Sequence, residues 1–106
     1  MTHGWEVVIA PQIEDEVRAI LAWWREHRPA SPDLLQRELD DALQLLVRWP
    51  GAGEQARLRG REVHRVVLRR TGYLVYDGVE ARARRVTVLR VRNGRRRPIR
   101  GVRRAR

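Results

Sequence analysis

The sequence contains no cysteine, and this absence excludes disulfide bonds and thiolate metal sites. Its three histidines, His3, His27 and His64, lie far apart in the sequence and show no metal-ligand spacing. We therefore expect no metal and no small-molecule cofactor. A chain without disulfide chemistry is typical of the cytoplasm, and we predict a cytoplasmic location.

Long apolar runs are also missing. No stretch of about eighteen apolar residues exists, so we expect no transmembrane helix and no membrane partner. The first residues, MTHGWEVVIAPQIEDE, lack the basic region and the apolar core of a signal peptide. A 106-residue chain with 42% hydrophobic residues can bury one modest core. We predict one domain over residues 1–97 and a basic tail over residues 98–106.

Lysine is absent as well, because all 23 basic residues are arginine. Codon bias in a GC-rich genome is one explanation, and selection for bidentate phosphate contacts is the other.

The charge is distributed unevenly along the sequence. Residues 1–56 contain five arginines and ten acids, which gives −5, whereas residues 57–106 contain eighteen arginines and three acids, which gives +15. This asymmetry predicts an anionic partner for the second half.

The hydrophobic pattern predicts an α+β fold that begins with a strand over residues 5–10. From Gln12 the period changes to that of a helix, which ends at Pro29. A second amphipathic helix follows, with Ser31 as its N-cap, and ends at WPGAG, residues 49–53. The short connection predicts that the two helices form an antiparallel hairpin.

The second half changes to a period of two residues, which predicts a three-stranded antiparallel meander. After the last strand, NGRRRPIRGVRRAR has no period, and we interpret it as basic tail. The predicted strands lie near residues 62–69, 72–77 and 84–92, with turns at residues 70–71 and 78–81.

The order of these phrases resembles the RelE/ParE superfamily of bacterial toxins. AWWREHRPASPDLLQRELDDALQLL is similar to the helical hairpin of that family, and WPGAG is similar to the loop after it. VHRVVLRRTGYLVYD resembles the two central strands, and VTVLRVRNGRRR resembles the last strand and the basic residues that follow. The resemblance covers about residues 5–97.

Members of this family are the toxins of type II toxin–antitoxin pairs, so the resemblance implies a cognate antitoxin that wraps and neutralises the toxin. Its contacts are expected in the groove of the helical hairpin and at the sheet edge. ParE-like members inhibit DNA gyrase by binding. RelE-like members cut messenger RNA on the ribosome without a metal, using cations on the phosphate and a group that transfers a proton.

The match to the nuclease residues is poor. Arg65 matches one basic position, but the next falls on Val67, and the arginine after the hairpin tyrosine falls on Leu74. The expected His or Tyr after the last strand falls at Asn93 or on arginines, which are poor acids and bases. We therefore predict a ParE-like toxin that binds DNA gyrase. The main alternative is a metal-independent endoribonuclease that acts on ribosome-bound mRNA.

The predicted site is a cationic patch on the sheet. Tyr73 and Tyr76 point to opposite faces of their predicted strand, so we expect one in the core, and stacking of a base by the other is an alternative left open. A plain nucleic-acid-binding module and a toxin that has lost its activity are further alternatives. For target binding we predict Arg65, Arg69, Arg90, Arg92, Arg95, Arg96 and Arg97. For a nuclease, the catalytic candidates are His64, Arg65, Arg90 and Arg92.

Overall fold

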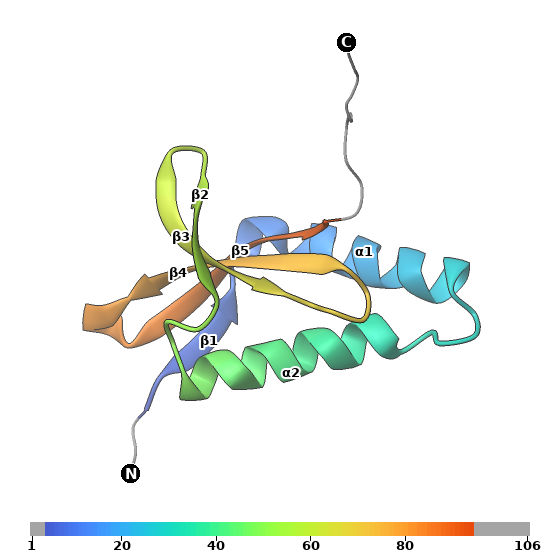
Figure 1. The fold of residues 1–106 in the computed structure, drawn as a ribbon, viewed down its shortest axis with the longest axis horizontal. Helices are drawn as coiled ribbons and strands as arrows, with labels where there is room; N and C mark the ends of the chain where they lie inside the picture. The colour runs from blue at the N-terminus through green and yellow to red at the C-terminus, as the bar shows by residue number, and fades with distance from the viewer. Residues whose placement is uncertain (1–3, 95–106) are drawn as a thin grey trace.

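The computed structural model describes residues 4–94, which form an α+β fold with two α-helices and one five-stranded sheet (Figure 1). The α+β prediction is confirmed. Within the described residues, no helix is long and apolar enough to cross a membrane. The elements are β1 (Glu6–Ile9), η1 (Pro11–Ile13), α1 (Glu14–His27), α2 (Leu34–Arg48), β2 (Glu54–Leu58), β3 (Arg61–Val67), β4 (Tyr73–Glu80), η2 (Ala81–Ala83) and β5 (Arg85–Asn93).

The sheet is larger than the predicted meander. Its order is β1-β5-β4-β3-β2, with β1 parallel to β5 and all other neighbours antiparallel. Strand β2 was missed because its sequence, EQARL, contains no β-branched or aromatic residue. It forms because a two-residue turn at Arg59 and Gly60 folds it onto β3. The predicted turn at residues 78–81 was placed too early, because β4 stays paired with β5 as far as Glu80.

The helices begin and end close to the predicted positions, but the expected cap of the second helix was wrong. The N-cap residue of α2 is Asp33, and no side chain caps the helix. Ser31 lies before it, and its carbonyl accepts hydrogen bonds from the Trp24 indole at 2.9 Å and from the Leu34 amide at 3.2 Å. The segment between the helices is therefore held by its backbone and by a buried tryptophan.

One hydrophobic core joins both helices to a single face of the sheet. The Trp24 and Tyr73 rings meet edge to face, with centroids 6.2 Å apart, and link α1 to β4. We call this side of the sheet the helix face and the opposite side the outer face. The buried core residues are Ala10, Ile13, Val17, Trp24, Leu35, Leu39, Ala42, Leu68, Tyr73, Val75, Val88 and Val91.

The carboxylate of Glu38 on α2 holds the turn between β3 and β4. It accepts hydrogen bonds from the amides of Arg70 and Thr71, both at 2.9 Å, and from the Thr71 hydroxyl at 2.8 Å. Thr71 is buried, so these donors need a partner inside the protein. One acid on α2 therefore holds the turn that connects the central strands β3 and β4.

We predict that Glu38→Ala lowers the free energy of unfolding by about 1–3 kcal/mol, because it leaves the turn donors without their acceptor. Urea denaturation of the purified protein measures this loss. Glu26→Gln removes an exposed carboxylate from α1, for which no hydrogen bond or ion pair is found, and should change stability by less than about 0.5 kcal/mol. Equal midpoints for the Glu38 variant and the wild type would show that the clamp is not stabilising.

Candidate functional site

Successive side chains of a strand point to opposite faces of the sheet, and this alternation places the arginines of the patch on one face. A bulge in β5 shifts the alternation by one residue. Val88 and Val91 both point into the core although they are three residues apart. Tyr76 pairs with Arg90 and Asp77 pairs with Val88, so Leu89 is the extra residue of a β-bulge. Because of the extra residue, Val88 and Val91 both face the core, and Arg90 lies on the outer face.

Four side chains on four neighbouring strands form a row across the outer face. Glu54 pairs directly with Arg65, Arg65 with Tyr76, and Tyr76 with Arg90. Directly opposed residues have Cβ atoms about 5 Å apart. Arg92 lies two positions beyond Arg90 on the same face of β5. The structure thus brings together three of the predicted arginines, and we call Arg65, Tyr76, Arg90 and Arg92 the outer-face cluster.

Tyr76 is the centre of this cluster and is only 3% exposed. Its hydroxyl accepts a hydrogen bond from Nη2 of Arg92 at 3.0 Å, and the Arg92 guanidinium lies 5.5 Å from the ring centroid. Tyr73 is also buried, on the helix face. Both tyrosines are therefore buried, and neither is exposed to stack a base. The Tyr76 ring instead supports the arginines that surround it.

The charges of the cluster are only partly compensated. Glu54 forms a hydrogen-bonded ion pair with Arg65. This bond, and secondly the bond to Tyr76, raises the pKa of Arg65 above its ordinary value. Within residues 4–94, no acid pairs with Arg90 or Arg92. Two positive charges on this face therefore have no counter-ion in the described part of the chain.

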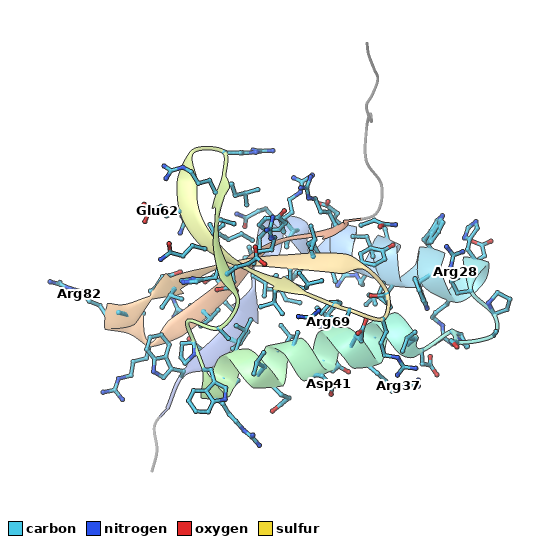
Figure 2. All side chains as sticks on the ribbon, viewed as in Figure 1. Arg28, Arg37, Asp41, Glu62, Arg69 and Arg82 are labelled. Atoms are coloured by element: carbon cyan, nitrogen blue, oxygen red, sulfur yellow. The ribbon has the colours of Figure 1, made fainter. Side chains whose placement is uncertain are left out.

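The other predicted target-binding residues do not join the cluster. Arg69 follows β3 and lies beside α2 (Figure 2), where it lines a groove of about 260 Å³ with Asp41 and Leu45. Arg95, Arg96 and Arg97, like the predicted tail, lie outside the described residues.

His64 lies on the other face of the sheet from Arg65, because the two are neighbours on β3. It pairs with Asp77 across the strands and lines a depression of about 310 Å³ with Gln55, Arg57 and four other residues. The four nuclease candidates therefore do not meet at one phosphate. Within residues 4–94, no three acidic or histidine side chains are grouped as metal ligands would be.

Glu54 and Tyr76 were not among the predicted site residues. Glu54 belongs to the strand that was not predicted, so its position opposite Arg65 could not be expected. Tyr76 was considered as a core residue or a stacking platform, and its actual role depends on the register between β4 and β5.

Two comparisons with known proteins identified no relative of this chain. A scan against protein-family models finds no match, and a search of the curated proteins finds no significant match.

Asp77 is fully buried, and neither of its carboxylate oxygens has a hydrogen-bond partner among the described residues. Nδ1 of His64, its cross-strand neighbour, is also buried without a partner there. Burial raises the pKa of the Asp77 carboxyl from 3.8 to about 7. The folded protein therefore holds a proton at Asp77 between these pH values, where the unfolded chain has released it.

Because the folded state binds this extra proton, the free energy of unfolding depends on pH. The stability that neutral Asp77 confers is fully present below about pH 4 and is lost as the pH rises toward 7 and above. We predict that Asp77→Asn, which does not titrate, becomes more stable relative to the wild type by roughly 2–4 kcal/mol between pH 4 and pH 8. Urea denaturation at several pH values measures the difference. Glu62→Gln, an exposed carboxylate on β3, is the matched control and should show no such trend. A difference that does not vary with pH would contradict the raised pKa.

Proposed function

We propose that this protein is the toxin of a type II toxin–antitoxin pair that acts in the ParE-like way, by binding a target rather than by cleaving RNA. DNA gyrase is the proposed target, and a cognate antitoxin is the proposed neutralising partner. The observation that carries the proposal is the outer-face cluster. Arg90 and Arg92 are positioned by Tyr76 and by strand pairing, and neither has an acidic partner within residues 4–94.

RelE/ParE-like toxins have the proposed order of elements, which is a strand, a helical hairpin and then an antiparallel meander. The strand–helix–helix–strand succession of residues 6–93 supports it. The additional strand β2 and the parallel pairing of β1 extend the sheet on both sides of the proposed meander. They leave its three strands as consecutive neighbours.

Binding is favoured over cleavage because, among residues 4–94, no suitable proton-transfer group lies beside Arg90 and Arg92 on the outer face. His64 lies on the opposite face, and the Tyr76 hydroxyl is buried beneath Arg92.

One observation favours the nuclease as a second candidate. Glu54 places a carboxylate, which can act as a general base, against Arg65. That carboxylate is held in an ion pair, and the described residues provide no matching acid near it.

A groove between α2 and the edge of β3 is the proposed antitoxin site. The pairing of β2 with β3 ends at Glu54 and Arg65, so no strand covers that edge of β3 at Val66 and Val67 within the described residues. Val67 is 40% exposed, and Leu45 on α2 faces the same groove at 39% exposure. An extended peptide can add to such an edge and place its apolar side chains in the groove.

We predict that induced expression of the chain arrests bacterial growth and that Arg90→Gln/Arg92→Gln relieves the arrest, because it removes both uncompensated charges. Colony counts after induction measure the effect, and a thermal melt confirms that the variant is folded. Arg37→Gln/Arg48→Gln removes the same charge from exposed positions on α2 and should leave the arrest intact.

The same cells distinguish the two mechanisms. Primer extension on translated messages should find them intact in arrested cells. Codon-linked cuts, or equal relief by the α2 control pair, would contradict the proposed binding mode.

We predict that Val67→Glu abolishes neutralisation by the antitoxin but leaves the arrest, because it places a charge in the apolar groove. Co-expression with the product of the neighbouring reading frame tests this, with growth as the readout. Val79→Glu is the matched control, because Val79 is 36% exposed and lies on β4 away from the groove. If the neighbour rescues growth equally for the wild type and for the Val67 variant, this groove is not the antitoxin site.

A further inference from the structure

The hairpin of β2 and β3 extends beyond the rest of the sheet. The two strands pair from Glu54 and Arg65 to Leu58 and Arg61, whereas the pairing of β3 with β4 begins only at His64. Residues 57–62 are therefore a two-stranded ribbon, which projects away from both helices (Figure 1). A two-stranded ribbon is marginally stable in water by itself. Such an extension adds little to the stability of the fold.

The tip of this ribbon has an unfavourable residue in its turn. Arg59 and Gly60 both have positive φ, 52° and 78°, which is the requirement of a type I′ turn. Gly, Asn and Asp meet this requirement best, and a long side chain with a positive φ costs about 1–2 kcal/mol. The arginine at this exposed position therefore lowers the stability of the turn.

The ribbon is also strongly cationic. It carries Arg57, Arg59 and Arg61, with Glu62 as its one acid. Arg57 is used within the ribbon, because its guanidinium donates to the Gly60 carbonyl at 2.7 Å and lies 3.6 Å from Glu62. Arg59 and Arg61 have no ion pair with any acid of the described residues.

The arginines of the ribbon continue into the outer-face cluster. Arg61 and Arg65 are four residues apart on β3, so both belong to the outer face. Nη2 of Arg61 approaches to 3.0 Å from the position that a Cβ atom would occupy at Gly78 on β4. Gly78 therefore leaves room for this side chain to extend along the sheet. Glu62, the acid of the ribbon, is exposed on the same projection (Figure 2).

We propose that this ribbon is a second binding surface, which enters the major groove of duplex DNA. The major groove of B-form DNA, about 12 Å wide, admits a two-stranded β-ribbon. Guanidinium groups at the tip then meet phosphates and the acceptor edge of guanine. The major groove of A-form RNA is too narrow for such an element, so the geometry favours DNA over duplex RNA. This surface is additional to the proposed toxin action and does not depend on it.

Fluorescence anisotropy of the full chain with a labelled DNA duplex of about 20 base pairs, repeated over a range of salt concentrations, tests the proposal. Each phosphate contact contributes about 0.9 to the slope of log K against log salt. Arg59→Gln/Arg61→Gln should therefore lower the slope by about 2 and weaken binding by about tenfold or more at physiological salt. Arg37→Gln/Arg48→Gln has the same net charge, and we expect it to change affinity less than twofold.

A single substitution separates binding from folding. Arg59→Asn replaces the strained residue by one that tolerates positive φ, so it should keep or raise the melting temperature while it weakens DNA binding. An RNA duplex of the same sequence should bind at least tenfold more weakly than the DNA. The proposal is overturned by equal binding of both duplexes, by equal losses in the ribbon and α2 variants, or by unchanged DNA binding of Arg59→Asn. None of these outcomes depends on growth arrest.

Discussion

The register between β4 and β5 determines which side chains the sheet presents to a partner. It is fixed by the burial of Val75, Val88 and Val91 beneath the helices, because a one-residue shift of β5 against β4 would move Val88 and Val91 out of the core. The bulge at Leu89 lets Val88 and Val91 share the core, and it leaves Arg90 opposite Tyr76. The cationic surface is therefore a consequence of how the apolar face packs.

The acidic half of the chain neutralises only a small part of the basic half. Asp15 pairs with Arg18 and Asp33 with Arg25, so these acids compensate arginines of their own helical region. Glu38 is occupied by the backbone and the hydroxyl of the β3–β4 turn. Where acids do reach sheet arginines, they form local pairs: Glu54 with Arg65, Glu62 with Arg57, and Glu6 and Glu80 with Arg85. Part of the positive charge that is left in residues 4–94 lies on the ribbon and the outer face, at Arg59, Arg61, Arg90 and Arg92.

Hydrophobic periodicity was sufficient to predict the two helices and the three long strands, because each of them buries a regular apolar stripe. It failed at β2, which is polar and forms through a turn and through pairing with β3. It placed Arg90 and Arg92 on one face correctly, since alternation alone requires this. It could not place Glu54 or show that Arg92 covers Tyr76, because both depend on the register in which neighbouring strands pair. The separation of His64 from the arginines follows from strand alternation and was available in the sequence.

The central claim is that the outer-face arginines act by binding a target, without chemistry of their own. The most direct test adds the purified protein to DNA gyrase in a plasmid supercoiling assay and, in parallel, to a ribosome translating a defined message. The account predicts that supercoiling is inhibited in proportion to the protein added and that the message remains whole. Undiminished supercoiling together with cleavage of the translated message would contradict it.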